Sequence, residues 1–326
     1  MKTISVLTHA YNEEDNIEAM YLRVREIMNG FPQYRYEHVF IDNASTDGTV
    51  AILKRIAEKD KNVKIIVNAR NFGHIRSPMH ALMQARGDAM IGIASDFQEP
   101  PDLIPEMIRA WEEGYPMVLC IKEGSGEHGL MFWLRKQYYR LVERLSSIET
   151  IQNFTGFGLY DRRVVDLVRS FQDTYPYFRG IIAEIGLPSK RLYFHQPARK
   201  SGITKNNWCT LYDIAMLGII NLSKIPLRLA VFAGFIGAML SFLTAMVYLI
   251  YKLLFWRSFS VGIAPVVIGI FFLNSIVLVF MGILGEYVGA IHTQVQKRPY
   301  AIERERINFE YEPELPMPME GSENGL

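Results

Sequence analysis

The sequence predicts an α/β domain with a mostly parallel sheet flanked by helices, followed by interfacial helices and a two-helix transmembrane hairpin. Two observations carry this prediction. Residues 3–121 alternate short runs rich in β-branched residues with amphipathic helical patterns, which is typical of βαβ units. Beyond residue 221 the chain becomes strongly apolar and contains two long stretches without a charged residue.

The elements of the first part follow from their hydrophobic periods. Strands are expected at 3–9, 36–42, 63–68, 88–94 and 117–121, where short runs are almost continuously apolar. Helices are expected near 14–29, 47–59, 76–86 and 102–113. Ligands of such sheets bind beyond the carboxyl ends of the strands, so the residues that follow each strand are the first candidates for a site.

Two further segments have amphipathic helical patterns. Residues 130–147 carry cations beside aromatic residues, so this helix either presents a solvated cationic face or lies close to anionic lipid headgroups. We interpret residues 206–225 as an interfacial helix that leads into the membrane.

The two apolar stretches are long enough to cross a bilayer. Twenty-three uncharged residues lie between Arg228 and Lys252, and 28 lie between Arg257 and Glu286. A spanning helix needs about 20 residues. Buried core helices are usually shorter and carry a polar stripe, so two adjacent uncharged stretches favour a membrane hairpin over two core helices.

The flanking charges predict how the hairpin is oriented. Six cations near its two ends outnumber Lys252 and Arg257 in the loop between the spans: Lys224, Arg228, Lys297, Arg298, Arg304 and Arg306. We therefore expect a multi-pass protein of the plasma (inner) membrane with both ends in the cytoplasm. Residues 1–16 lack an apolar region long enough for a signal peptide, so the N-terminal domain is expected to stay on the cytoplasmic face.

Composition argues against several other classes of protein. The 326 residues include 35 Lys and Arg against 34 Asp and Glu, and nucleic-acid binding would require a strongly basic surface. We therefore expect no nucleic-acid partner. Cys120 and Cys209 lie far apart and belong to no CxxC motif or Cys/His cluster, which predicts neither a disulfide nor a zinc site.

Polar motifs follow three of the predicted strands. After the first strand comes AYNEEDNI, in which Asn12 is expected to cap a helix. Asp42 closes the second strand, and residues 45–48 are expected to form a turn that opens the next helix. The fourth strand ends in ASDFQEPPD, where Asp96 could hold a hard cation and residues 100–102 mark a helix start.

These motifs, taken in order, resemble those of a known family. The set AYNEEDNI, FIDNASTDGT, NARNFGH, GDAMIGIASDFQEPP, GLYDRRV and RKSGITK, followed by two spans, is similar to the family 2 glycosyltransferases with a GT-A fold. More narrowly, it resembles the polyisoprenyl-phosphate glycosyltransferases, which include dolichyl-phosphate mannose synthase and bacterial undecaprenyl-phosphate sugar transferases. The resemblance covers about residues 2–308 and implies that the predicted sheet is of the GT-A type.

The resemblance implies which residues bind the nucleotide sugar. Ala10, Tyr11 and Glu13 are expected to line the nucleotide pocket, and Asp42 to meet the base. Arg70, in NARNFGH, is expected near the nucleotide or its phosphates.

The resemblance also implies which residues carry the reaction. Asp96 and Gln98 are expected on the metal and sugar edge, with Asp96 as a ligand of Mg²⁺ or Mn²⁺. Arg199, Lys200 and Lys205 are expected to bind the acceptor phosphate, with Arg199 and Lys205 stabilising it during attack. A lipid phosphate at headgroup level needs cations beside the bilayer, which agrees with this placement.

Three positions depart from the family pattern. Ala94 stands where the metal motif Asp-x-Asp has its first carboxylate, Asn43 follows Asp42 where many members have a second aspartate, and Gly156 replaces an acidic residue. The carboxylates that could substitute for the missing ones are Glu99, Asp161 and Glu184, although a structural role is favoured for each of them and Asp161 is expected to cap a helix.

The implied reaction transfers a sugar from a nucleotide sugar, a UDP-hexose by resemblance, to polyprenyl (undecaprenyl) phosphate with inversion, for modification of cell-envelope glycans. The departures leave open an alternative, a catalytically inactive GT-A scaffold that partners a membrane sugar-translocation protein. A processive polymer synthase is less favoured because the sequence has only two spans and no QxxRW motif.

The expected organisation has four parts. Residues 1–205 form the cytoplasmic GT-A domain, 206–225 the interfacial helix, 226–292 the two transmembrane helices and 293–326 a cytoplasmic C-terminal tail. Asn274 and the small residues at 234–238 favour helix contacts in the membrane, which predicts a homo-oligomer, either a dimer or a tetramer.

Overall fold

The computed structural model describes residues 1–123, 151–197, 225–255 and 263–310, with the isolated positions 216, 220 and 223. The predicted helix at 130–147, most of the segment at 206–225, the basic residues at 199–205 and Cys209 lie outside the described residues. The chain divides into two compact units. The first comprises the described residues of Met1–Lys136, Glu149–Asn207 and Gln296–Leu326, and the second those of Gln137–Ile148 and Trp208–Val295.

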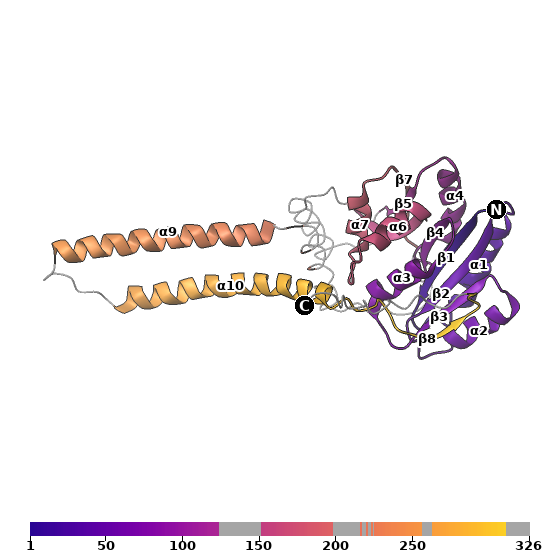
Figure 1. The fold of residues 1–326 in the computed structure, drawn as a ribbon, viewed down its shortest axis with the longest axis horizontal. Helices are drawn as coiled ribbons and strands as arrows, with labels where there is room; N and C mark the ends of the chain where they lie inside the picture. The colour runs from indigo at the N-terminus through magenta and orange to yellow at the C-terminus, as the bar shows by residue number, and fades with distance from the viewer. Residues whose placement is uncertain are drawn as a thin grey trace, which may run out of the picture. The chain divides into compact units, whose positions relative to one another are not determined.

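The first unit is built on an eight-stranded mixed sheet in the order β7-β5-β6-β4-β1-β2-β3-β8 (Figure 1). Its strands are β1 (Thr3–Ala10), β2 (Arg35–Asp42), β3 (Val63–Asn68), β4 (Ala89–Ala94), β5 (Met117–Lys122), β6 (Phe154–Asp161), β7 (Ser189–Phe194) and β8 (Glu303–Ile307). Strand β1 pairs in parallel with β2 and β4, and β2 with β3. The prediction of a mostly parallel sheet flanked by helices is confirmed, and all five predicted strands are present.

Side chains alternate between the two faces of the sheet, and a layer of helices covers each face. Helices α1 (Ile17–Asn29), α2 (Thr49–Lys59) and α4 (Ile104–Glu112) pack against one face, and α3 (Gly73–Gln84), α6 (Arg162–Ser170) and α7 (Phe178–Ile185) against the other. Strand β1 shows the alternation, because Val6 belongs to the first core and Leu7 to the second. This three-layer arrangement explains why the strands are apolar on both faces.

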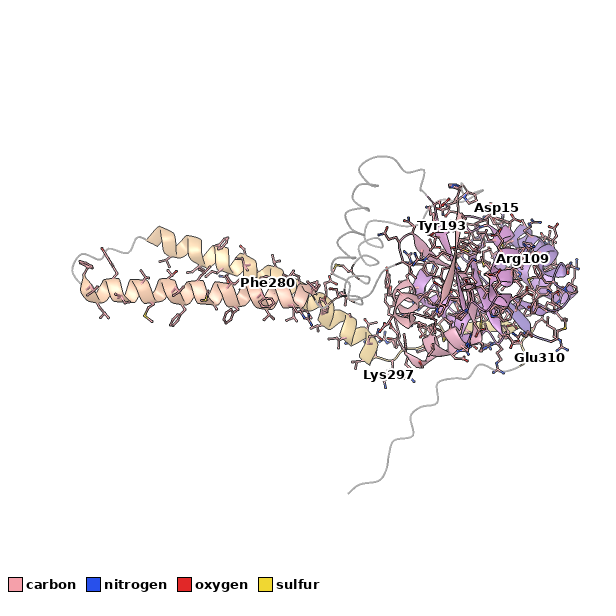
Figure 2. The ribbon with its side chains drawn as sticks, turned by 90° about the horizontal axis from the view of Figure 1, so that it is seen from above. Asp15, Arg109, Tyr193, Phe280, Lys297 and Glu310 are labelled. Carbon is pink, nitrogen blue, oxygen red and sulfur yellow. The ribbon has the colours of Figure 1, made fainter. Side chains whose placement is uncertain are left out.

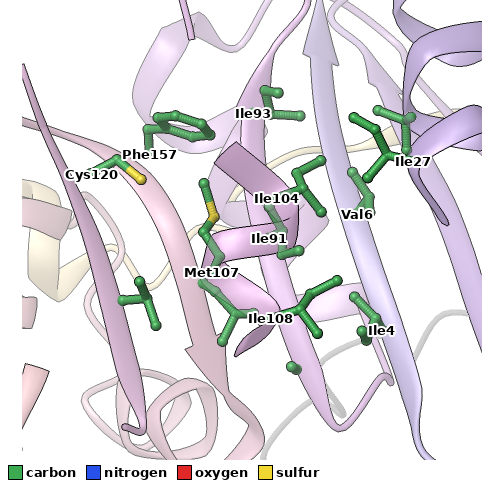
Figure 3. Packing of buried hydrophobic residues seen from close by; sticks show 14 of the residues in the cluster. Ile4, Val6, Ile27, Ile91, Ile93, Ile104, Met107, Ile108, Cys120 and Phe157 are labelled. Atoms are coloured by element: carbon green, nitrogen blue, oxygen red, sulfur yellow. The ribbon is translucent and has the colours of Figure 1, made fainter. Parts of the chain in front are cut away.

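Figure 3 shows the core beneath α4. Ile104, Met107 and Ile108 of this helix meet Val6 of β1 and Ile91 of β4. A short 3₁₀ turn, η1 (Pro101–Leu103), introduces α4 with a proline in its first position, as the PPD sequence predicts. The helix thus starts directly after the motif at the end of β4, so packing of its apolar face holds that motif in place.

Three strands differ from the sequence-based expectation. Strand β6 runs antiparallel between β4 and β5, and β7 pairs in parallel with β5 at the edge of the sheet. At the opposite edge, β8 pairs antiparallel with β3. The expectation of a tail from residue 293 was therefore wrong for residues 303–307, because the charged segment ERERI carries no apolar signal for a strand.

A cluster of charged side chains holds β8 against the helix layer. His80 of α3 lies 2.6 Å from the Glu303 carboxylate. Arg306 donates a hydrogen bond of 2.7 Å to Glu303 and one of 2.8 Å to Gln84. The C-terminal segment thus belongs to the sheet domain, although two long helices separate it from the rest of that domain in sequence.

The second unit contains two long apolar helices, α9 (Ile225–Leu254) and α10 (Ile263–Val295). Their segments Ile225–Thr244 and Phe272–Val295 are long and apolar enough to cross a bilayer, and at most 6% of either is buried. Figure 2 shows their side chains projecting from the helices, with Phe280 labelled on α10. The Tyr287 hydroxyl donates a 2.6 Å hydrogen bond to the Ser223 carbonyl, which ties α10 to the residues just before α9.

Candidate active site

The residues predicted to bind the nucleotide sugar meet at one edge of the sheet. Strands β1 to β4 are mutually parallel, so their carboxyl ends share that edge, with Ala10 opposite Asp42 and His9 opposite Ala94. Tyr11 and Glu13 directly follow β1. At the same edge, Arg70 follows β3, and Asp96 and Gln98 follow β4. The tertiary structure thus brings together every predicted site residue among the described ones, whereas Arg199, Lys200 and Lys205 lie outside them.

The loops after β1 and β2 are joined by reciprocal hydrogen bonds. The Thr46 amide donates to the Asn12 side chain at 2.8 Å, and the Asn12 amide donates to the Ser45 hydroxyl at 2.9 Å. The Gly48 amide donates to the Glu14 carboxylate at 2.7 Å. The prediction that Asn12 caps a helix was wrong: α1 begins only at Ile17, because the Asn12 side chain is engaged with the neighbouring loop.

Asp42 is fully buried at the end of β2. Its Oδ2 accepts a 2.9 Å hydrogen bond from the Ser45 amide, which closes the predicted turn. Its Oδ1 is buried and has no hydrogen-bond partner among the described residues. Burial raises the pKa of Asp42, while hydrogen bonds from Ser45 and Ala44 lower it. A buried hydrogen-bond acceptor without a partner is energetically costly. A ligand that donates a hydrogen bond to this oxygen would remove that cost.

Two carboxylates follow β4. Asp96 is 7% exposed, and its Oδ1 accepts a 3.1 Å hydrogen bond from the Gln98 amide. Glu99 folds back onto the sheet: Oε2 accepts a 2.8 Å bond from the Ala94 amide, and Oε1 a 3.0 Å bond from the Thr155 hydroxyl. Burial raises the pKa of Glu99 to about 7, against the lowering effect of these two hydrogen bonds.

Electrostatic interactions join these carboxylates to three residues that the sequence analysis did not select. Burial lowers the pKa of His9, the Asp96 carboxylate raises it, and His74 lowers it. Burial and the guanidinium of Arg179 both lower the pKa of His74. Arg179 also lowers the pKa of Glu99, whereas Asp96 raises it. His9, His74, Asp96, Glu99 and Arg179 therefore form one connected set of ionisable groups, which we call the edge cluster.

The sequence offered unequal signals for the three missed residues. His9 directly precedes the AYNEEDNI motif and His74 ends the NARNFGH motif, so both could have been selected from their positions. Arg179 lies in α7, in a stretch without a recognisable motif. Only the packing of α7 beside β6 brings it into the edge cluster.

Comparison with known proteins assigns the chain to a family. Residues 5–171, just over half of the chain, match the profile of Glycosyl transferase family 2. The chain belongs to glycosyl transferase family 2. A relative named SfII prophage-derived bactoprenol glucosyl transferase, from Shigella flexneri, is 32% identical over 297 residues, which cover 91% of this chain and 96% of that protein. An uncharacterized glycosyltransferase from Synechocystis is 30% identical over 311 residues, covering 95% and 97%.

A solved structure also aligns with this glycosyltransferase. The glucosyl-3-phosphoglycerate synthase of Mycobacterium tuberculosis, in complex with Mn²⁺, UDP and phosphoglyceric acid, is 17% identical with a TM-score of 0.46. The alignment covers 67% of this chain and 76% of that one.

The asparagine at position 43 of this glycosyltransferase has a structural explanation. Its Oδ1 accepts hydrogen bonds from the Phe72 amide and the Asn68 side chain, at 2.9 and 3.2 Å. Its Nδ2 donates to the Asn71 side chain at 2.9 Å and to the Gly73 carbonyl at 3.2 Å. An ionised aspartate could make only the first two bonds, because it has no donor. Asn43 therefore fixes the loop between β3 and α3, directly before His74 in the first turn of α3.

The three carboxylates considered as substitutes differ in position. The Asp161 side chain caps α6 by accepting from the Arg163 amide at 3.0 Å, as predicted, and also accepts from the Trp111 indole at 2.8 Å. Glu184 is exposed on α7. Glu99 is the one that interacts with Asp96.

Arg70 has less contact with the site than the other predicted residues. Its guanidinium lies 4.1 Å from the centroid of the Phe72 ring and donates a 3.1 Å hydrogen bond to the Asn71 carbonyl. The residue is exposed, so its charged group stays available at the edge that holds the other candidates.

Proposed function

We propose that this glycosyltransferase transfers a sugar from a nucleotide sugar, a UDP-hexose, to polyprenyl phosphate, with undecaprenyl phosphate as the acceptor. One observation carries the proposal: the similarity to a protein named bactoprenol glucosyl transferase extends over 91% of this chain. It therefore includes the apolar helices as well as the sheet domain. Helices of this kind suit an enzyme whose acceptor lies in a membrane.

The carboxyl edge of the sheet supports the donor half of the proposal. The buried Oδ1 of Asp42 needs a hydrogen-bond donor, and the N–H group of a uracil ring would supply one. The hydrogen-bonded loops that follow β1 and β2 hold Tyr11 and Glu13 beside Asp42, so the base-binding end would be organised before the donor arrives.

The residues at this edge fit a divalent cation bound together with the donor. The described residues contain no group of three His, Cys, Asp or Glu side chains arranged to hold a metal ion. Mg²⁺ commonly binds through one or two carboxylates plus substrate phosphates, and Asp96 offers such a carboxylate beside Gln98. When bound, Mg²⁺ or Mn²⁺ would neutralise the charge of the leaving diphosphate.

The acceptor needs little activation by the protein. A phosphate monoester has a second pKa of about 6, so most of the acceptor phosphate carries two negative charges at neutral pH. It can therefore attack without a strong general base. The protein would then align the two substrates and stabilise charge. We assign the acceptor phosphate to Arg199, Lys200 and Lys205, and the reaction to in-line displacement with inversion at the anomeric carbon.

The apolar hairpin supports the membrane part of the proposal. A polyprenyl tail gains roughly 0.8 kcal/mol per buried CH₂ in a bilayer, so the enzyme must reach the lipid there. We propose a multi-pass protein of the plasma membrane with its catalytic domain, residues 1–205, on the cytoplasmic face. Helix contacts through the small residues of α9 would support a dimer or tetramer.

The decisive experiment uses the purified full chain with undecaprenyl phosphate, Mg²⁺ or Mn²⁺, and a panel of labelled nucleotide sugars. We expect label from one sugar to enter the organic phase, and Asp96→Ala to abolish that transfer. Arg199→Ala should mainly raise the KM for the lipid. Binding of UDP without transfer of any sugar would instead favour the inactive scaffold.

A further inference from the structure

We infer that Arg179 of the edge cluster is a phosphate-binding residue of this active site, because its guanidinium is half-buried there and has no hydrogen-bond or ion-pair partner among the residues that the structure describes. The inference rests on the proposed function, which brings two kinds of phosphate to this edge. One is the diphosphate of the donor and the other is the phosphate of the acceptor lipid.

Packing fixes the position of the helix that carries Arg179. Phe178 begins α7, and its ring meets that of Tyr160 edge-to-face, with centroids 5.3 Å apart. The same ring covers Gly156 of β6, where an added Cβ would lie 3.5 Å from Cδ1 of Phe178. The first turn of α7 is thus anchored on β6, next to the Thr155 hydroxyl that donates to Glu99.

Arg179 is unusual among the half-buried arginines of the sheet domain. Within the described residues of that unit, the others all donate hydrogen bonds or form ion pairs: Arg23, Arg76, Arg162, Arg169 and Arg306. Arg162, for example, donates to the Ala85 carbonyl at 3.1 Å. Arg179 has neither a hydrogen bond nor an ion pair in the described part of the chain. Its electrostatic interactions there are with His74 and Glu99, and they lower the pKa of both groups.

The carboxylate of Glu99 interacts electrostatically with Arg179 but forms no ion pair with it. Both oxygens of Glu99 are turned toward other donors, the Ala94 amide and the Thr155 hydroxyl. His74, which also interacts with Arg179, is a base whose pKa is lowered, so it carries little charge at neutral pH. Among the described residues, Arg179 therefore interacts with Glu99 only at longer range, and no carboxylate forms an ion pair with its half-buried guanidinium.

An anion is the ligand that such a group fits. A guanidinium cannot lose its proton in a protein, and it presents five donors in a planar fork that matches two oxygens of a phosphoryl group. Charge-assisted bonds of this kind are about twice as strong as neutral ones. Because Asp96 belongs to the same edge cluster, an anion held by Arg179 would lie beside the proposed cation and the transferred sugar.

The test compares Arg179→Gln and Arg179→Lys with the wild type, using the full chain in detergent micelles. Arg191→Gln removes an exposed arginine of β7 and serves as the matched control. Calorimetry with UDP and Mg²⁺, without lipid, reports on the donor phosphates. The KM for undecaprenyl phosphate, at saturating nucleotide sugar, reports on the acceptor phosphate.

We expect Arg179→Gln to weaken one of the two interactions by about tenfold or more, with partial rescue by Arg179→Lys and no change in Arg191→Gln. A raised Kd for UDP identifies the donor diphosphate, and a raised KM for the lipid identifies the acceptor phosphate. If both constants stay within about twofold of the wild type in a variant with an unchanged melting temperature, the inference is wrong. If the wild type binds UDP but transfers no sugar, the proposed function fails, while the UDP measurement still tests Arg179.

Discussion

The hydroxyl of Thr155 donates a hydrogen bond of 3.0 Å to the carboxylate of Glu99, and this bond ties the start of β6 to the segment after β4. The second oxygen of Glu99 accepts from the Ala94 amide. The resemblance to the polyisoprenyl-phosphate glycosyltransferases implies carboxylates at positions 94 and 156, where this chain has Ala94 and Gly156. Here one half-buried carboxyl group accepts from the backbone of residue 94 and from the side chain next to residue 156, so a carboxyl group lies between the two altered positions.

Replacing this carboxylate should affect activity and the pH dependence of stability. Glu99→Gln leaves one acceptor where two are needed, so we expect transfer to fall by about tenfold, which corresponds to one lost hydrogen bond to a charged group. The rate of sugar transfer measures this. In the double variant that combines Glu99→Gln with Gln98→Glu, the new carboxylate at position 98 does not restore the hydrogen bonds of Glu99. We therefore expect this double variant to transfer sugar no faster than Glu99→Gln alone.

The pH dependence of Glu99 has a defined sign. Its pKa is raised from 4.5 to about 7 in the folded protein, so the native state binds more protons than the unfolded one between these values. The stabilisation is complete below pH 4.5 and is lost as pH rises through about 7. Glu99→Gln should therefore gain stability relative to the wild type as pH increases from 5 to 8, measured by thermal unfolding. Parallel pH profiles of the two proteins would contradict the assignment.

His38 should have the opposite effect on stability. It is buried in β2, its Nε2 lies 2.9 Å from the Thr8 hydroxyl, and burial lowers its pKa from 6.5 to about 3. The unfolded state then binds more protons, so stability is lost as pH falls from 6.5 toward 3, by about 1.4 kcal/mol per pH unit at most. His38→Gln cannot titrate, so its melting temperature should decline less steeply over that range.

Asn43→Asp tests why this position lacks the carboxylate of the family pattern. The ionised aspartate would face the acceptors of Asn71 and Gly73 without a donor, which should destabilise the domain by about 1–3 kcal/mol. A protonated aspartate can donate one bond. The destabilisation should therefore be larger at pH 8 than at pH 4, and a loss of equal size at both pH values would argue against this explanation.

Because charged side chains attach β8 to the domain, replacing two different arginines of this strand should reduce stability by different amounts. Arg306 and Glu303 have side chains only 11% and 12% exposed, so Arg306→Met leaves a buried carboxylate with fewer partners and should cost about 3 kcal/mol. Arg304 is exposed on the same strand, and Arg304→Met should change stability by less than about 0.5 kcal/mol. Denaturation of the two variants side by side measures the difference; equal losses would mean that β8 is held by its backbone alone.

Local patterns were sufficient for much of the fold. Five strands and four helices were predicted within a few residues, because each buried strand is a short apolar run and each helix has one apolar face. The apolar stretches of α9 and α10 were equally plain, since a spanning helix must be long and uncharged. The parallel order of the first strands then placed Ala10, Asp42 and Asp96 at one edge.

Pairing partners were beyond the reach of the sequence. The antiparallel strand β6 enters between β4 and β5, and β8 returns to β3 from the end of the chain, because hydrogen bonding to a distant edge leaves no periodic signature in either segment. The sequence alone determined that a polar, carboxylate-bearing edge exists. Only the tertiary structure decided that His9, His74 and Arg179 join Asp96 and Glu99 there, since electrostatic interaction depends on proximity in space, and the helix packing of α3 and α7 creates that proximity.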